Sequence, residues 1–297
     1  MNLSRREFLG VAATLALGTA FAAEEPEPII DIHQHTNYSG RTDDQLIAHQ
    51  KAMGVMTTIL LPAGKYYGLD AACGGNDTCV RLAQQRGAGE YRFFANEMPY
   101  LSTASEEIKK YLKMGGIGIG EQKFRVLSDS KHIQKIAAIA QEFDVPVLLH
   151  FWDGDYNLEF ARFYKTLEKF PKVNFIGHAQ SWWANIDKNY QGGEVYPKGP
   201  VTQGGLTDKW LSEYPNMFGD MSAGSGLNAI IRDEEHYKGF IERHQDKLLF
   251  GSDCNDHLGR GPGCQGAQIL AAIRRVAGSK EIERKVLFHN ARKLMKL

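Results

Sequence analysis

The sequence lacks an excess of charge of either sign. Its 297 residues include 35 Lys and Arg and 35 Asp and Glu, which gives a formal net charge of zero and a pI near 7.1. Proteins that bind nucleic acid neutralise phosphates with surplus Lys and Arg. The balance therefore argues against nucleic acid as a partner.

The chain also lacks a hydrophobic run long enough to cross a bilayer. The longest run near its start, Val11 to Ala23, has 13 residues, whereas a membrane-spanning helix needs about 20. We therefore expect no stable insertion into a membrane. Internal repeats, low-complexity tracts and linkers rich in Pro or Ser are also missing, so one folded domain is the simplest expectation.

Cysteine is scarce. The four cysteines fall into two local pairs, Cys73 with Cys79 and Cys254 with Cys264. In an oxidising compartment each pair could close as a small disulfide, although four cysteines allow three pairings. The C-x5-C spacing is not that of a zinc ribbon, which makes a structural zinc held by these thiols the less favoured interpretation.

The first residues have the pattern of an export signal. Two adjacent arginines in Ser4-Arg5-Arg6-Glu7-Phe8-Leu9 precede the apolar run, and Ala20-Phe21-Ala22 has the small-x-small pattern of a cleavage site. This segment resembles a twin-arginine signal peptide. The resemblance implies a signal at residues 1–22, a mature domain at 23–297, the twin-arginine export machinery as a partner, and a periplasmic or other extracytoplasmic location in a bacterium.

After this segment, short apolar runs alternate with longer helical patterns. Such alternation predicts parallel strands with crossover helices, and eight units in about 270 residues predict a (β/α)8 TIM barrel. A doubly wound open sheet is the alternative, but no glycine-rich dinucleotide motif follows the first strand. The expected strands are Ile29–His35, Val55–Leu61, Tyr91–Glu97, Ile117–Lys123, Val145–Phe151, Val173–His178, Met217–Ser222 and Lys247–Asp253, with helices at His132–Phe143, Leu158–Phe170 and Gln268–Ala277.

Residue types that bind metals stand where several of these strands end. His33 and His35 are two residues apart in the first strand, so their side chains should project to one face. His150, His178 and Asp253 end the fifth, sixth and eighth strands. A single histidine at such a place is usually structural, but the carboxyl ends of barrel strands meet at one mouth, so five such residues predict a metal site there.

The fourth strand adds Glu121 and Lys123, which should share a face. Glu121 could bind or bridge metal or act as a base, and Lys123 could bind a substrate anion. The alternative is an internal Glu–Lys ion pair at the rim of the barrel.

In this order the residues resemble the metal-dependent amidohydrolase superfamily, specifically its amidohydrolase-related group that includes aminocarboxymuconate-semialdehyde-decarboxylase-like enzymes. The resemblance extends from Ile29 to Leu294 and includes the closing segment Leu287–Leu294. It implies that His33, His35, His150 and Asp253 bind metal and that His178 faces substrate or binds a second ion. Glu121 lies where many members carry a bridging residue, so one or two ions fit the pattern.

Three imidazoles and a carboxylate suit a borderline divalent ion, Zn²⁺ first and Mn²⁺ or Fe²⁺ as alternatives. Such an ion lowers the pKa of bound water from about 15.7 to near 7. Asp253 could then accept the proton of the water, and His178 could hydrogen-bond the substrate carbonyl or the oxyanion.

Further residues are candidates for contact with a small-molecule substrate. The longest irregular stretch, residues 179–205, contains Trp182 and Trp183, which either stack on a substrate or fix the loop to the barrel. After the seventh strand, Ser222, Asn228 and Arg232 are weaker candidates. Arg232 could bind a carboxylate, but pairing with Asp233 or another acid is the favoured interpretation.

These residues are compatible with three functions. The first is hydrolysis of an amide, ester or lactone by a metal-activated water, with catalytic roles for Asp253, His178 and Glu121. The second is non-oxidative decarboxylation at the same site, and the third, less favoured, is a metal-binding barrel without turnover. The sequence leaves the substrate and the formation of a homo-oligomer open.

Overall fold

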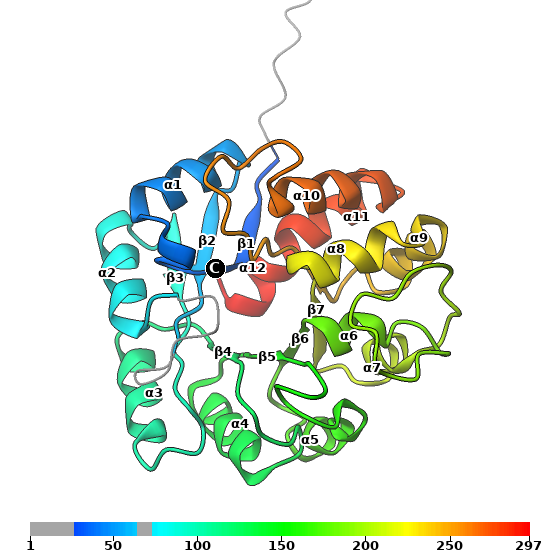
Figure 1. Cartoon of the computed structure of the whole chain (residues 1–297). Helices are drawn as coiled ribbons and strands as arrows, with labels where there is room; N and C mark the ends of the chain where they lie inside the picture. Colours follow the sequence, from blue (N-terminus) through cyan, green and yellow to red (C-terminus); the bar gives the residue numbers. More distant parts are fainter. Residues whose placement is uncertain (1–26, 64–72) are drawn as a thin grey trace, which may run out of the picture.

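The computed structural model describes residues 27–63 and 73–297, and the twin-arginine segment lies outside these residues. Eight parallel strands form a ring with helices around it (Figure 1). The strands are β1 (Ile30–Gln34), β2 (Thr57–Leu60), β3 (Tyr91–Phe93), β4 (Ile119–Gln122), β5 (Val147–His150), β6 (Phe175–His178), β7 (Met217–Asp220) and β8 (Leu248–Leu249).

Each strand falls within a run predicted from the sequence, and all eight are shorter than predicted. The chain from Phe250 to Asp253 continues beyond β8 without regular strand structure. The predicted helix His132–Phe143 is α4, Gln268–Ala277 corresponds to α10, and Leu158–Phe170 is divided between η2 and α5.

The helices follow the strands in order along the chain. They are α1 (Asp43–Ala52), α2 (Asn76–Arg86), α3 (Ala104–Lys113), α4 (Lys131–Phe143), α5 (Tyr164–Lys169), α6 (Gln180–Ala184), α7 (Leu206–Glu213), α8 (Ala223–Ile231), α9 (Glu234–Arg243), α10 (Gln265–Val276), α11 (Lys280–Arg284) and α12 (Asn290–Met295), with two short 3-10 helices, η1 (Tyr38–Gly40) and η2 (Phe160–Arg162), and a π-helix, η3 (Lys285–His289).

The strands pair in two groups, β1-β2-β3 and β4 to β8, and individual hydrogen bonds join the groups at both seams. At the first seam, Ala95 after β3 pairs with Ile119 of β4. At the second, the Ile32 amide donates to the Phe250 carbonyl at 3.1 Å and the Asp253 amide donates to the His33 carbonyl at 2.9 Å. The expected (β/α)8 barrel is therefore the fold of this chain.

Two apolar clusters hold the barrel together. A large one lies between strands and outer helices, and a smaller one joins inward residues such as Ile32, Leu148 and Ile176 to α12. Since side chains alternate along a strand, Leu148 and His150 share one face of β5, as Ile176 and His178 do on β6. The barrel interior is thus apolar near α12, while the carboxyl ends of β5 and β6 present imidazoles to the mouth.

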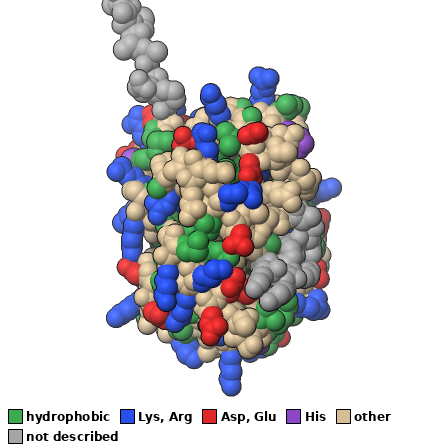
Figure 2. All heavy atoms as spheres, turned by 90° about the vertical axis from the view of Figure 1, so that its left-hand side faces the viewer, with side chains coloured by type: hydrophobic (Ala, Val, Ile, Leu, Met, Phe, Trp, Pro, Cys, Tyr) green, Lys and Arg blue, Asp and Glu red, His purple; other side chains and the backbone are tan. Residues whose placement is uncertain are grey.

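On the face shown in Figure 2, basic and acidic side chains are intermixed and form no patch of one sign. Among the helices of the described residues, none combines the length and the apolar character required to span a bilayer.

Candidate active site

Polar side chains from the ends of β1, β4, β5 and β6 and from the segment after β8 meet at the mouth of the barrel. The five residues His33, His35, Glu121, His150 and His178 are at most 6% exposed. Asp253, which follows β8, has a side chain 12% exposed. The structure therefore brings together all six residues that the sequence proposed as metal ligands or catalytic groups.

A first group of donor atoms comes from both sides of the seam between β1 and β8. Nε2 of His33 and Nε2 of His35 are 3.2 Å apart. Asp253 Oδ1 lies 3.8 Å from Nε2 of His33 and 3.4 Å from Nε2 of His35. Three ligand atoms at this spacing can bind one metal ion.

A second group lies beside the first and consists of Glu121, His150 and His178. Oε1 of Glu121 is 2.5 Å from Nδ1 of His150 and 3.6 Å from Nε2 of His178. The other oxygen of Glu121 is 3.7 Å from Nε2 of both His33 and His35, so this carboxylate borders both groups. His150, which the family resemblance places with the first-strand histidines, belongs here to the second group.

Hydrogen bonds on the far side of each ring orient the imidazoles. His35 donates from Nδ1 to the Leu61 carbonyl at 2.7 Å. His33 donates from Nδ1 to Asp220 Oδ2 at 2.7 Å, and Ser222 donates its hydroxyl hydrogen to the same oxygen at 2.8 Å. With its hydrogen used there, Ser222 Oγ accepts from Nδ1 of His178 at 3.0 Å. With Nδ1 of all three rings engaged in this way, Nε2 is the nitrogen that faces the centre of the site.

The sequence reasoning missed Asp220, although this acid ends β7 at the position equivalent to the other site residues. Its side chain is fully buried, and its Oδ1 also accepts from the Ser222 amide at 3.0 Å. A side chain at Gly251 would place a Cβ 2.5 Å from Asp220 and 2.9 Å from Cβ of His33. Glycine at this position is what allows β1, β7 and the segment after β8 to approach one another.

A second missed acid, Asp31, joins β1 to the segment after β8. It accepts hydrogen bonds from the amides of His33 and Ser252 and from the side chain of Gln50. Burial raises the pKa of Asp31, and these hydrogen bonds oppose the rise. Asp31 therefore fixes the backbone beside both His33 and Asp253.

The charges at the mouth are strongly coupled. Burial lowers the pKa of His33, but the negative charges of Asp253 and Asp220 outweigh it and hold the pKa well above its usual range. Burial also lowers the pKa of His35, but Cys73 and Asp253 raise it more, and the net result is a pKa of about 10. The two imidazoles in turn lower the pKa of Asp253 to about 2 against the effect of burial. The acids at this mouth thus favour protonated imidazoles. A bound cation could take the place of these protons and balance the same negative charges.

The donor set fits a divalent metal ion. Nε2 of His150, Nε2 of His178 and Oδ1 of Asp253 are buried without any hydrogen-bond partner, which is costly unless another group satisfies them. Imidazoles with hydrogen-bonded Nδ1 atoms and adjacent carboxylates are the usual surroundings of a protein-bound borderline ion.

Two further residues line the site. The ring of Tyr38 packs edge-on against His35, with centroids 5.0 Å apart, and the negative charge of Asp253 together with burial raises the pKa of its phenol. Lys123 places Nζ 5.2 Å from the ring centre of Tyr156, whose ring contacts His150. No ion pair of Lys123 with Glu121 occurs in the described part of the chain, so Lys123 stays a candidate for binding a substrate anion.

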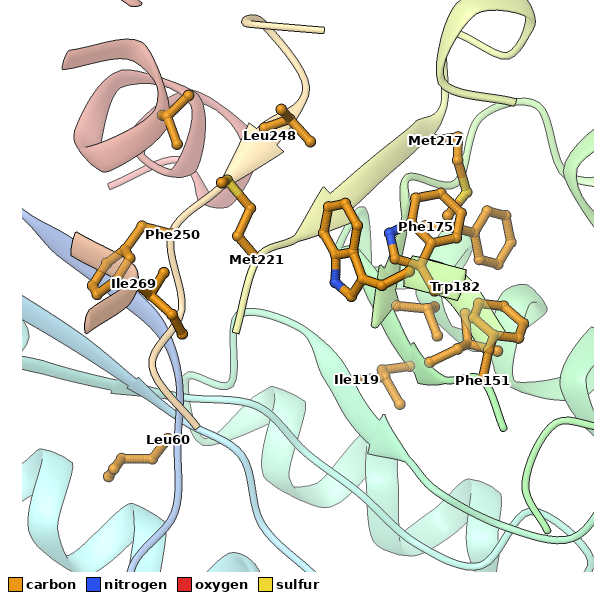
Figure 3. Close-up of a cluster of buried hydrophobic side chains, with 14 of the residues drawn as sticks. Leu60, Ile119, Phe151, Phe175, Trp182, Met217, Met221, Leu248, Phe250 and Ile269 are labelled. Carbon is orange, nitrogen blue, oxygen red and sulfur yellow. The ribbon is translucent and has the colours of Figure 1, made fainter. Parts of the chain in front are cut away.

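The proposed substrate contact of the two tryptophans is wrong. Trp182 and Trp183 lie on α6 and are 0% and 2% exposed. Trp182 packs among core residues that include Phe151 and Phe175 (Figure 3). Trp183 donates from Nε1 to the Asp220 carbonyl at 2.9 Å. Their large apolar rings are core, which is the alternative that the sequence left open.

The remaining candidates after β7 have different surroundings. Ser222 belongs to the hydrogen bonds behind His33 and His178, as described above. Asn228 donates to the Pro197 carbonyl at 3.0 Å. The side chain of Arg232 is 3% exposed and lies 3.6 Å from Asp187, so it pairs with an acid other than Asp233. We find no contact of Asn228 or Arg232 with the donor groups in the described residues.

Neither predicted disulfide is formed, since Cys73, Cys79, Cys254 and Cys264 are all free thiols. Cys73 instead acts on His35, whose pKa it helps to raise. The sulfur atoms of Cys254 and Cys264 are 3.8 Å apart.

Comparison with known proteins agrees with this geometry. A family model described as amidohydrolase matches residues 30–297. No curated protein sequence matches the chain. Among solved structures, a probable 2-pyrone-4,6-dicarboxylic acid hydrolase from Acinetobacter baumannii with citric acid bound superposes with a TM-score of 0.60 at 15% identity, over 91% of this chain and 99% of the other.

Two decarboxylases share the same fold. A 2,6-dihydroxybenzoate decarboxylase from Rhizobium has a TM-score of 0.55 at 14% identity, covering 91% of this chain and 99% of its own. A 5-carboxyvanillate decarboxylase from Novosphingobium aromaticivorans with bound manganese has a TM-score of 0.53 at 14% identity, with 87% and 81% covered. The match over nine-tenths of the sequence, with the histidines and acids gathered at the barrel mouth, shows that this chain belongs to the amidohydrolase family of enzymes.

Proposed function

We propose that the protein is a metal-dependent hydrolase that cleaves an amide, ester or lactone in a small molecule. The observation that carries this proposal is the convergence of Nε2 of His33, His35 and His178 with the carboxylates of Glu121 and Asp253. These atoms face one another, and two of them, His178 Nε2 and Asp253 Oδ1, have no other partner.

The ion that best suits these donors is Zn²⁺, with Mn²⁺ or Fe²⁺ as alternatives. His33, His35 and Asp253 would hold one ion, and Glu121, His150 and His178 offer a place for a second. When bound, such an ion supplies Lewis-acid chemistry, because it polarises a substrate oxygen and lowers the pKa of water.

The residues around the ion would handle the proton. Asp253 has a pKa of about 2, so it is ionised at neutral pH and can accept a hydrogen bond from the attacking water. In the tautomer with a proton on Nδ1, His178 donates to Ser222, and its Nε2 is then the atom that can take up a proton from that water. Once protonated, His178 can donate from Nε2 to the departing group, because Asp220 stabilises the imidazolium from the other side at 3.2 Å.

We further propose that Lys123 binds an anionic part of the substrate. Its Nζ lies beside Tyr156, which contacts His150 at the mouth. A lysine here favours substrates that carry a carboxylate close to the bond that is cleaved.

The test is isotope incorporation from solvent with a panel of carboxylated lactones, esters and amides. Hydrolysis predicts that oxygen from ¹⁸O-labelled water enters the product, and that Asp253→Asn removes most turnover while the fold persists. Asp256→Asn is the matched control, because Asp256 lies in the same segment but its carboxylate accepts from backbone amides of its own loop, among them those of Leu258 and Gly259. Near-wild-type turnover of Asp253→Asn would remove Asp253 from the mechanism.

The second candidate is decarboxylation of a small carboxylated substrate. It is favoured by the same Lys123 and by the protonatable Nε2 of His178, which could deliver a proton to carbon. Deuterium from solvent on the product carbon with release of CO2, and no incorporation of ¹⁸O, would identify this reaction.

We also propose that residues 1–22 direct the protein through the twin-arginine machinery and that a mature domain of residues 23–297 acts in the periplasm or elsewhere outside the cytoplasm. The paired arginines and the cleavage-site pattern support this. Fractionation of cells that produce wild type and an Arg5→Lys, Arg6→Lys double variant tests it, since only the wild type should appear outside the cytoplasm.

A further inference from the structure

A second group of metal-binding side chains lies outside the active site. We call it the thiol cluster, and it consists of His49 in α1, Cys254 after β8, and Cys264 at the start of α10. The segment between β8 and α10 lies beside α1 and β1 (Figure 1), which brings these residues together from distant parts of the sequence. All three residues are at most 3% exposed, so the cluster is shielded from bulk solvent.

The spacing of the donor atoms is that of a bound cation. Sγ of Cys254 and Sγ of Cys264 are 3.8 Å apart, and Sγ of Cys264 is 3.4 Å from Nε2 of His49. Two thiolates bound at about 2.3 Å to a tetrahedral ion lie about 3.8 Å apart, and a thiolate and an imidazole lie about 3.5 Å apart. A disulfide requires a sulfur separation of about 2.05 Å.

The surroundings favour thiolates and a soft ion. The Ala267 amide donates to Sγ of Cys264 at 3.4 Å at the amino terminus of α10, where the helix dipole stabilises negative charge. Sδ of Met53 is 4.0 Å from Sγ of Cys264 and adds a thioether to the cluster. Thiolate, thioether and imidazole ligands together select Zn²⁺ or Cu⁺ over harder ions.

The backbone is shaped to bring this segment onto α1. Gly259 has a φ of 67°, and a Cβ there would come within 2.2 Å of the His49 carbonyl. Arg41 donates to the carbonyls of Cys254 and Asp256 and fixes the start of the same segment. The thiols and the imidazole are thus held in position from several sides.

We propose that the thiol cluster binds one thiophilic cation with a filled d shell, Zn²⁺ or Cu⁺, through Cys254, Cys264 and His49. Binding forms two metal–thiolate bonds and one metal–imidazole bond, and the two thiols release their protons to solvent. The ion fastens both ends of the 254–264 segment to α1. Since Asp253 precedes Cys254 directly, the ion also fixes the backbone that carries the Asp253 carboxylate.

The test compares the metal content of the reduced, full-length wild type with that of Cys264→Ser and Cys79→Ser. Cys79 is the matched control, because it is equally buried but contacts Thr36 instead of the cluster. Each protein is equilibrated with Zn²⁺ alone, or anaerobically with Cu⁺ alone, desalted and analysed for metal. Loading with Co²⁺ adds a spectroscopic signature, since thiolate-bound Co²⁺ has an intense charge-transfer band in the near ultraviolet.

We expect Cys264→Ser to hold one ion fewer per chain than the wild type and Cys79→Ser, and to lose the charge-transfer band. His49→Gln keeps both thiols and should weaken binding of the same ion, which covers the case in which Cys264→Ser fails to fold. His33→Asn should lose metal from the active site and keep the band, so the two sites are tested separately. The Zn²⁺ and Cu⁺ arms identify which ion is retained against a competing chelator.

Two results would overturn the proposal. One is equal metal content and an unchanged band in wild type, Cys264→Ser and His49→Gln. The other is a Cys254–Cys264 disulfide in freshly isolated protein whose reduced form binds no additional ion, which would assign the pair to redox chemistry instead.

Discussion

Replacing Asp220 by Asn tests the idea that hydrogen bonds behind the imidazoles orient them towards a cation. Asp220 is fully buried, and the charges of His33 and His178 lower its pKa against the effect of burial, so it is ionised and only accepts hydrogen bonds. One oxygen accepts from the Ser222 amide, and the other accepts from Nδ1 of His33 and the Ser222 hydroxyl.

An asparagine cannot reproduce this pattern. If its carbonyl oxygen accepts from the Ser222 amide, its NH2 group faces Nδ1 of His33, and both groups are donors. His33 would have to move its proton to Nε2, which would then no longer be a ligand atom. In the opposite orientation the NH2 group faces the Ser222 amide, and a buried donor stays unsatisfied.

The magnitude follows from the bond that is lost. A hydrogen bond to a charged group contributes about 1.5–3 kcal/mol, and about 1.4 kcal/mol corresponds to a tenfold change in a binding constant. Asp220→Asn should therefore weaken Zn²⁺ binding by about 10- to 100-fold, the range typical of residues that orient metal ligands.

The assay is competition for Zn²⁺ against a chromophoric chelator, with thermal unfolding measured in parallel. Ser222→Ala is the control, because it keeps the carboxylate and its bond to His33 and should have the smaller effect. Zn²⁺ affinity of Asp220→Asn within about twofold of wild type, in a folded protein, would refute the reasoning.

Three further outcomes are expected. Because His35 in the cation-free protein has a pKa of about 10, a cation must displace its proton, so Zn²⁺ affinity should rise with pH; an affinity independent of pH in the same chelator assay would contradict this. Trp182→Ala removes a fully buried ring and should destabilise the fold by about 3–5 kcal/mol in denaturant titrations, whereas a raised KM at unchanged stability would restore the substrate-contact hypothesis. Burial raises the pKa of Asp208, but bonds to His244 and Arg243 outweigh it and lower the pKa, so this acid stabilises the fold above about pH 4 and the stabilisation is lost below. Asp208→Asn should therefore cost about 1–3 kcal/mol at neutral pH and progressively less in acid, and a pH-independent difference would exclude the ion pair as its cause.

The sequence predicted the barrel because its strands are short apolar runs buried on both faces, separated by helical patterns. The six mouth residues could be predicted for a related reason, since each stands at or just beyond the carboxyl end of such a run. Asp220 also stands at the carboxyl end of a strand, but a single acid at such a place does not by itself predict a role. Its role depends on a contact with His33, which is 187 positions away in the sequence.

Other differences arise from contacts that the local sequence does not encode. Trp182 lies in a short helix of five residues within a stretch of polar and glycine residues, so the apolar pattern that would assign it to the core is too short to read. The local sequence around His49 gives no sign of its contact with Cys264, because the two residues are 215 positions apart. Arg232 was correctly expected to pair with an acid, but its partner is Asp187, in the long segment after α6.

The seam between β1 and β8 joins the beginning of the barrel to its end. A few backbone hydrogen bonds close it, and β8 itself has just two residues, so local opening should cost less here than between strands that pair along their length. The same boundary separates His33 and His35 from Asp253. A cation shared by these residues would fasten the first strand to the last, so that occupancy of the catalytic centre would also raise the resistance of the whole ring to unfolding.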